Sequence, residues 1–214
     1  MRSLAPLAAT LVLAPLALLA ARTEAAPAAS VAPHTPVATG AAEGPVSGAY
    51  QIDPVHSSLV FNVRHADASR FWGRFNAFSG SLTVDADKPA ASSIVVEVQA
   101  ESIDTANPGR DQHLRGPDFF NAKEFPLIVF DSTEVERSDK GFRVKGELTL
   151  LGVTQEVSAE AEFVGYSESE RFKKRTGYEV RFEIQRSQFG MNYMVGPMLG
   201  DEVELIFSLE GMAE

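Results

Sequence analysis

Three residues at the start of the predicted folded region have the types that hydrolases use for nucleophilic catalysis. They are Asp53, His56 and Ser57, an acid, a base and a hydroxyl close together in the sequence. The chain has no Gly-x-Ser-x-Gly nucleophile elbow, and a catalytic triad is defined by its geometry rather than by closeness in sequence. An Asp-Pro pair favours the start of a turn. We therefore expect a turn at Asp53, with His56 and Ser57 bonding to the backbone, and no catalytic residue.

Histidines offer a second chemistry, because three imidazoles can hold a zinc ion. The predicted folded region contains His56, His65 and His113. His56 and His65 lie at opposite ends of one predicted strand, which separates them by about 30 Å in an extended chain. They cannot share an ion in that arrangement, so we expect no metal site.

The composition excludes several other functions. The 214 residues carry a formal net charge of -10, with 44% hydrophobic and 22% charged residues, as in a globular protein. An acidic surface repels phosphate backbones, so we expect no nucleic-acid partner. The absence of cysteine excludes disulfides, thiolate metal ligands, cysteine nucleophiles and a lipidated cysteine anchor.

The N-terminal region has the features of targeting and spacer segments. Residues 1–25 combine a basic start with an apolar run and small residues, as in a secretory signal peptide that is cleaved after Ala25. Residues 26–48 are rich in Ala and Pro and have no aromatic residue, which predicts a disordered linker. We expect export to the periplasm, with secretion, or tethering by an uncleaved signal, as alternatives.

From residue 49 to 214, apolar and polar residues alternate. The clearest segment is 202–210, where apolar residues occupy every second position: Val203, Leu205, Phe207 and Leu209. The same pattern recurs in seven further segments, at 59–63, 71–84, 94–100, 127–135, 142–150, 155–163 and 178–185. A period of two residues indicates half-buried antiparallel strands with one dry face and one wet face.

One segment departs from this pattern. Residues 107–120 begin with Asn107-Pro108 and include Gly116-Pro117, which predicts one or two helical turns. About eight amphipathic strands can close as a barrel or pack as a two-sheet sandwich. The inward rows carry bulky apolar side chains without compensating charges. This favours an all-β fold, an eight-stranded antiparallel barrel with the short helical segment capping one end.

Five motifs in order resemble those of the YceI-like, polyisoprenoid-binding family. They are the segments 50–57, 61–65 with 73–75, 114–120 with 125–130, 146–154 and 186–190. The resemblance covers Tyr50 to about Leu209 and departs from the family pattern at Leu151 and Asn121. It implies a lipocalin-like barrel whose lumen takes an amphiphilic isoprenoid lipid, such as a quinone or a prenyl phosphate.

If the inward rows line such a lumen, the lipid tail contacts eight side chains along the strands: Phe61, Val63, Val96, Leu148, Phe163, Val180, Phe182 and Phe207. Hydrocarbon contacts are non-directional, so they distinguish tails only by length and bulk. Specificity must then come from polar groups at the open end of the barrel. Our candidates for the head-group rim are His65, Arg186 and Asn192.

The two kinds of head group need different partners. An arginine such as Arg186 can grip phosphate with two bonds, whereas a quinone carbonyl needs one neutral donor such as Asn192. The net acidic charge disfavours a doubly anionic ligand, so we expect binding that is insensitive to salt.

Two loops have unusual compositions. Residues 191–199 contain three of the five methionines, which suit either an adaptable rim around an entering tail or a loop packed on the end of the barrel. Residues 168–175 contain a basic cluster, which we interpret as a solvated hairpin tip rather than a site for anionic head groups.

Three functions from different classes are consistent with these observations. The favoured one is non-enzymatic binding or carriage of an isoprenoid lipid, with no other cofactor. The second is a fully packed structural or interaction barrel without a small-molecule ligand, and the third is an enzyme that acts on a lipid or a small acid. A membrane redox partner and a homodimer are compatible with the first.

Overall fold

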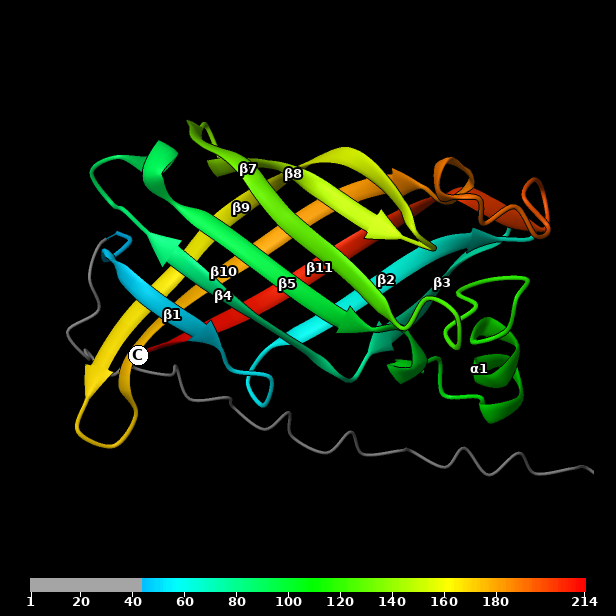
Figure 1. Cartoon of the computed structure of the whole chain (residues 1–214), viewed down its shortest axis with the longest axis horizontal. Coiled ribbons are helices and arrows are strands. Elements are labelled where there is room, and N and C mark those ends of the chain that lie inside the picture. The colour runs from blue at the N-terminus through cyan, green and yellow to red at the C-terminus, as the bar shows by residue number, and fades with distance from the viewer. Residues whose placement is uncertain (1–43) are drawn as a thin grey trace, which may run out of the picture. The chain divides into compact units, whose positions relative to one another are not determined.

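The computed structural model describes residues 44–214 (Figure 1). The expected signal peptide, residues 1–25, lies outside the described residues, and so does the expected linker up to residue 43. The first strand begins at Gly48, the last residue of that linker range. No helix within 44–214 is long and apolar enough to cross a membrane.

Strands make up most of the described chain. The elements, in chain order, are β1 (Gly48–Ile52), β2 (Ser58–His65), β3 (Ser69–Phe75), β4 (Phe78–Val84), β5 (Ser93–Gln99), β6 (Ile103–Asp104), α1 (Pro108–Leu114), β7 (Leu127–Ser138), β8 (Gly141–Leu150), β9 (Val153–Ser169), β10 (Lys173–Gln185) and β11 (Leu199–Ala213). Short 3-10 helices follow β4, β5 and β10, at Pro89–Ala91, Ala100–Ser102 and Arg186–Phe189.

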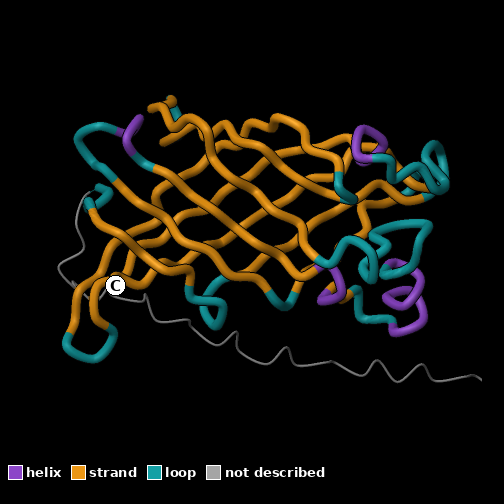
Figure 2. Tube along the Cα trace, in the orientation of Figure 1, coloured by secondary structure: helices purple, strands orange, loops and turns teal. Residues whose placement is uncertain are grey.

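The strand segments form eight long antiparallel strands, because three of the long strands are interrupted. β1 and β2 pair with successive parts of β11, and β4 and β3 pair with them in turn. β5 pairs with β4, and β6, which follows β5 in the chain, pairs with β3. Each long strand pairs with the next along the chain, and β11 pairs back to β1, which closes the sheet (Figures 1 and 2). The expected eight-stranded barrel is confirmed, in place of the two-sheet sandwich.

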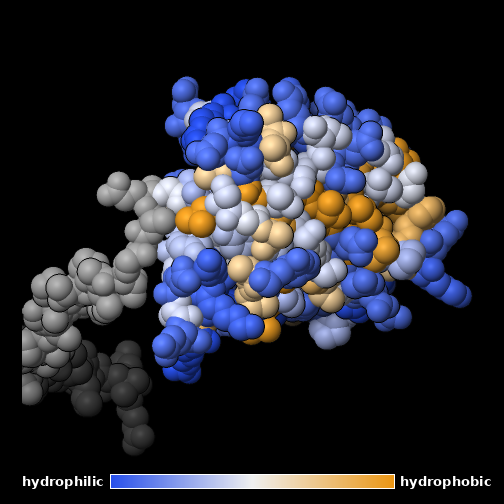
Figure 3. Space-filling view, turned by 60° about the vertical axis from the view of Figure 1, so that its left-hand side comes forward, coloured by the Kyte–Doolittle hydropathy of each residue, from blue (hydrophilic) through white to orange (hydrophobic). Residues whose placement is uncertain are grey.

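The alternation of residue types matches the alternation of burial. On β10, Val180 and Phe182 face the barrel interior, whereas Arg181 and Glu183 are exposed on the outer surface. Hydrophilic side chains cover much of the face that Figure 3 presents. The apolar rows therefore pack inward while most charges stay in water, as the two-residue period predicts.

Helix α1 lies at one end of the barrel, as expected (Figure 1). It begins at Pro108 after Asn107, whose side-chain oxygen accepts a hydrogen bond from the Arg110 backbone N–H at 3.0 Å. A polar N-cap and a proline in the first turn both favour the start of a helix at this point. The helix ends at Leu114, which packs against the barrel core, as does Phe120 beyond it.

Two strand glycines allow phenylalanine rings to lie over a neighbouring strand. Gly73 of β3 is paired with Phe61 of β2, and a Cβ atom at Gly73 would collide with the Phe61 ring. A Cβ atom at Gly146 of β8 would collide in the same way with the ring of Phe130 from β7. Glycine in a strand marks such close approaches, and here it lets the rings lie close to the barrel wall.

Replacing Phe182 with aspartate is expected to destabilise or unfold the domain, because an unpaired charge in the barrel interior costs roughly several kcal/mol. Glu183→Lys, one residue along on the outer face, should leave stability nearly unchanged. Denaturant unfolding of both variants beside the parent protein measures the difference. Equal losses of stability would contradict the inward orientation of this apolar row.

Candidate ligand-binding site

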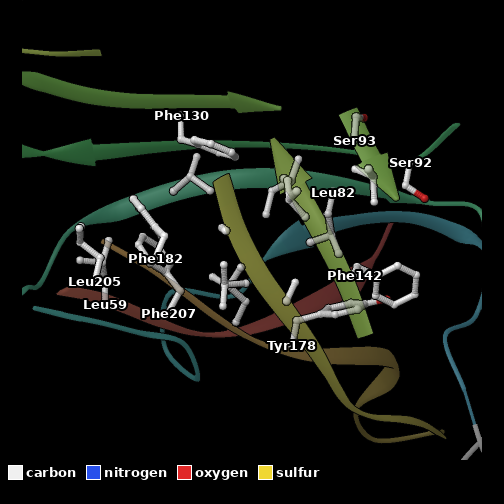
Figure 4. A pocket seen from close by; sticks show the side chains of 18 of the residues that line it. Leu59, Leu82, Ser92, Ser93, Phe130, Phe142, Tyr178, Phe182, Leu205 and Phe207 are labelled. Carbon is white, nitrogen blue, oxygen red and sulfur yellow. The ribbon is translucent and has the colours of Figure 1, made fainter. Parts of the chain in front are cut away.

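Two adjoining cavities occupy the barrel interior. The larger, of about 530 Å³, opens at the end where α1 lies, and we call it the outer cavity. The smaller, of about 130 Å³, is called the inner cavity (Figure 4). Four side chains border both cavities: Phe75, Ile128, Leu148 and Leu205. The outer cavity has a size typical of small-molecule sites, and the inner one is close in size to an apolar cavity that takes one benzene molecule.

The inner cavity is almost entirely apolar. Its walls include four of the expected tail contacts, Val96, Val180, Phe182 and Phe207. Tyr178 contributes a phenol whose pKa is raised by burial, so this side chain brings no charge near neutral pH. Polar residues border the cavity at one end, where Figure 4 places Ser92 and Ser93 away from Phe130 and Leu205.

The outer cavity accounts for most of the other expected tail contacts. Phe61 and Val63 line it, and Leu148 borders both cavities. Phe163 lines neither, because its half-buried ring packs against Tyr178 with ring centroids 5.7 Å apart. The structure thus brings all the proposed lumen residues except Phe163 to the two cavities, and their contact with a ligand stays a prediction.

Polar side chains gather at the open end of the outer cavity, which we call the mouth. His65, at the end of β2, is exposed there and lines the cavity, as the sequence suggested. Arg110 and His113 line the same cavity from α1, although neither stands out in the sequence as a ligand contact. A helix of two turns carries too little periodic signal to predict which of its sides faces the barrel.

Arg110 is held across the mouth by Thr105 and Phe71. Its Nε donates to the Thr105 hydroxyl at 2.8 Å, and its Nη2 donates to the Thr105 carbonyl at 2.7 Å. The guanidinium carbon lies 4.3 Å from the centre of the Phe71 ring, a cation–π distance. The mouth therefore presents one positive charge in a set position.

His113 belongs to an aromatic cluster on the same rim. Its ring meets the rings of Phe119 and Tyr193 edge-on, with centroids 5.2 and 5.3 Å apart. Its Nε2 lies 2.8 Å from a carboxylate oxygen of Asp118. The imidazole is therefore oriented by three neighbours and faces the cavity as a polar group among apolar ones.

Arg186 lines the outer cavity as expected, but its guanidinium is bonded to the backbone rather than free to grip a phosphate. Its guanidinium is buried and donates four hydrogen bonds of 2.8–3.3 Å to backbone carbonyls: those of Gly200, Met191, Tyr193 and Leu199. Burial lowers the pKa of this arginine, and Asp201 opposes that shift. A guanidinium has five N–H groups, so too few remain for a bidentate grip on a ligand. Arg186 instead holds the chain that leads into β11.

Asn192, the third proposed head-group contact, also has another position. It lies in residues 191–198, which we call the mouth loop, but its side chain is exposed and lines neither cavity. Its Nδ2 donates to the Gly190 carbonyl at 3.2 Å. Loop residues follow no strand period, so the direction of this side chain could not be read from the sequence.

Asp53, His56 and Glu210 come together outside both cavities, with spacing that would suit a metal ion. Arg175 Nη1 lies between the two carboxylates, donating to Asp53 at 2.7 Å and to Glu210. The guanidinium thus supplies the cation at this point. Hydrogen bonds from Arg175 and then from His56 hold the pKa of the Asp53 carboxyl well below its ordinary value of 3.8.

The same cluster is a turn, as the sequence predicted. Asp53 accepts a hydrogen bond from the Val55 backbone N–H at 2.9 Å, and Ser57 accepts one from the Glu210 N–H, also at 2.9 Å. The His56 side chain departs from the expectation, because it bonds to the Asp53 carboxylate rather than to the backbone. Ser57 and His56 form hydrogen bonds with different partners and not with each other, so the arrangement is not that of a nucleophile with its base.

Comparison with known proteins identifies relatives across the whole barrel. The sequence model of the YceI-like domain matches residues 50–211. A UPF0312 protein of Yersinia pestis is 38% identical over 173 residues, which cover 80% of this chain and 90% of the relative. A UPF0312 protein of Yersinia enterocolitica matches with the same identity and coverage.

Solved structures share the fold. BcnA of Burkholderia cenocepacia superposes with a TM-score of 0.65 at 22% identity, covering 74% of this chain and 98% of that one. The YCEI protein of Campylobacter jejuni gives 0.63 at 27% identity, covering 71% and 90%. A polyisoprenoid binding domain from Saccharophagus degradans, implicated in plant cell wall breakdown, gives 0.59 at 15% identity, covering 77% and 98%.

Asp53→Asn is expected to lower the free energy of unfolding at neutral pH by roughly 1–3 kcal/mol, because Arg175 and His56 lose their charged acceptor. The pKa of Asp53 lies below 3.8 in the folded state. Its contribution is therefore present above that pH and is lost as pH falls below it. Unfolding measured between pH 7 and 2 should show a gap between parent and variant that narrows in acid.

Asp87→Asn, at an exposed turn, is the matched control and should follow the parent protein throughout. A constant gap between the parent and Asp53→Asn at every pH would show that the carboxylate charge has no part in the cluster's stability.

Proposed function

Because this chain belongs to the family of YceI-like domains, a family of lipid-binding barrels, we propose that it binds and carries one isoprenoid lipid of quinone or polyprenyl type. The lipid lies in the two cavities of the barrel. We further propose that the protein does so in the periplasm after export by residues 1–25. The observation that carries this proposal is an apolar interior that meets basic and imidazole side chains at the mouth.

The size and lining of the cavities support a tail rather than a compact ligand. Together they are about four times as large as a cavity that takes one benzene-sized group. A tail that buries about 500 Å² of apolar surface gains on the order of 12 kcal/mol. Association costs of roughly 4–15 kcal/mol are subtracted from that gain, which allows micromolar to nanomolar binding.

The direction of entry follows from where the polar groups lie. Arg110, His113 and His65 border only the outer cavity, at the mouth. A head group placed there keeps its hydrogen bonds, whereas among the apolar walls of the inner cavity it would lose them at a cost of roughly 2–7 kcal/mol. The polar residues of the inner cavity, such as Ser92 and Ser93, border its far end and include no basic side chain. The tail therefore enters first, and its far end lies in the inner cavity.

The mouth favours a head group with little charge. His113 is hydrogen-bonded to the Asp118 carboxylate, and Arg110 already makes two hydrogen bonds to Thr105. We propose that a quinone carbonyl accepts a hydrogen bond from His65 or from an N–H of Arg110 that Thr105 leaves free, and that a hydroxyl donates to His113. The remaining N–H groups of Arg110 make a prenyl phosphate the alternative, which the first experiment below distinguishes.

The other two hypotheses receive less support. A fully packed barrel does not contain a cavity of about 530 Å³. An enzyme needs a nucleophile or an acid–base pair beside its substrate, and the Asp53 cluster lines neither cavity. Non-enzymatic binding is the hypothesis that accounts for both apolar cavities.

The function is tested by native mass spectrometry of the protein purified from its own host, followed by titration with a long-chain isoprenoid quinone and a prenyl phosphate. We expect a reproducible apolar adduct, and quinone binding that is nearly the same at low and high salt, because no ion pair is screened. A tighter, strongly salt-dependent complex with the prenyl phosphate would show that the site prefers a charged head group to a neutral one. No adduct and no binding of either lipid would overturn the function.

The direction of entry is tested by filling the inner cavity. Val96→Phe should weaken binding of a long-tailed quinone by roughly tenfold and leave a short-tailed analogue unaffected, because only the long tail needs that volume. Val95→Phe is the control, because Val95 directly precedes Val96 in β5 and lines neither cavity. Calorimetric titration of all three proteins gives the affinities, and thermal unfolding confirms that each is folded. Equal weakening for both tail lengths would contradict tail-first entry.

A further inference from the structure

The mouth loop concentrates exposed apolar surface. Nine large hydrophobic side chains are exposed among the described residues, and four of them lie in this one loop: Tyr193 (39%), Met194 (47%), Val195 (40%) and Met198 (52%). The loop sequence, Met-Asn-Tyr-Met-Val-Gly-Pro-Met, contains no charged residue. Scattered exposed hydrophobics need no explanation, but a group of them on one loop indicates an interaction surface.

This surface continues into the ligand site. Tyr193, Met194 and Met198 line the outer cavity and are exposed to solvent at the same time. Val195 is exposed but lines neither cavity. An apolar tail that leaves the cavity at this side of the mouth would therefore pass over methionine side chains, which are flexible and adapt to irregular shapes.

The loop is held in this position by its backbone. Arg186 donates to the carbonyls of Met191 and Tyr193 from beneath, and Ala66 N–H donates to the Met198 carbonyl at 3.0 Å. Met194 has a φ of 53°, in the left-handed region that few non-glycine residues adopt. The loop is thus fixed in a conformation that leaves its apolar side chains exposed.

Two basic side chains around the mouth are paired with acidic ones, and Arg110 is bonded to Thr105. Arg64 lies 3.5 Å from Asp67 in the adjacent β2–β3 turn, and His113 lies 2.8 Å from Asp118. The opposite end of the barrel is different, because its β9–β10 turn combines exposed Phe172 with charged neighbours of both signs, among them Lys174 beside Glu168 (Figure 1). The mouth loop has no charged residue and so the chemistry of a neutral apolar contact, whereas the turn at the opposite end is charged.

We infer that the mouth loop is a membrane-contact surface, which inserts into an uncharged bilayer surface so that a lipid tail passes between bilayer and barrel without crossing water. The inference rests on the proposed function, because an isoprenoid lipid resides in a bilayer. Methionine and valine suit the acyl boundary and tyrosine the head-group level. Arg64 and His113 already have acidic partners and therefore require no anionic lipid.

The test measures transfer of a long-chain isoprenoid quinone from phosphatidylcholine vesicles to the protein. Val195→Asp should slow transfer by roughly tenfold or more, because a carboxylate resists insertion among acyl chains. The affinity for the same quinone in detergent micelles should be unchanged, because Val195 lines neither cavity. Phe172→Asp, at a side chain that is 49% exposed on the opposite end, is the matched control and should transfer at the parent rate.

Co-sedimentation with quinone-free vesicles, of phosphatidylcholine alone and of phosphatidylcholine mixed with an anionic phospholipid, separates this inference from the proposed function. We expect the parent protein and Phe172→Asp to sediment with the vesicles at low and high salt, and Val195→Asp to stay in solution. The inference is overturned if the parent protein does not sediment, if it sediments only with anionic vesicles at low salt, or if Phe172→Asp is the variant that loses binding. Sedimentation without quinone uptake in either medium would instead overturn the proposed function alone.

Discussion

The pairing of β1 with β11 closes the sheet, and both cavities depend on it. Only three residues of β1 pair with β11, from Tyr50 to Ile52, before the strand is interrupted and continues as β2. The interruption is bonded to β11 by the Asp53 N–H, which donates to the Glu210 carbonyl at 2.8 Å, and by the shared guanidinium of Arg175. Asp53 and Ser57, two of the residue types of a hydrolase site, therefore join the edges of the barrel, which explains why both are buried although they line neither cavity.

The sequence allowed the strands and most of the lumen to be predicted, because a two-residue period is local information. Val180 and Phe182 face inward for the same reason that their polar neighbours face out, and no knowledge of other strands is needed. Phe163 also packs against the core, where it pairs with Tyr178, but it lines neither cavity. The period predicts the face of a side chain but not its depth along the barrel.

The mouth could not be predicted in the same way, because its geometry depends on how loops dock. Arg186 and Asn192 are polar residues beside the end of β10, and the sequence does not show that one is buried under carbonyls while the other is exposed. The buried guanidinium acts like a bound cation, since it gathers carbonyl oxygens from the mouth loop and from the start of β11. The buried Arg186 thus holds the backbone of the mouth loop, whose methionine side chains stay exposed.

The order of the strands around the barrel has a consequence for how the chain can be rearranged. Each strand neighbours the next in sequence, and the Glu214 N–H donates to the Ala49 carbonyl at 3.3 Å, so the last strand lies against the first. The order is a circle with no preferred starting strand. Linking residues 49 and 214 and opening the chain at the exposed β7–β8 turn would keep all the strand pairings and break only one tight turn. This barrel is therefore suited to circular permutation.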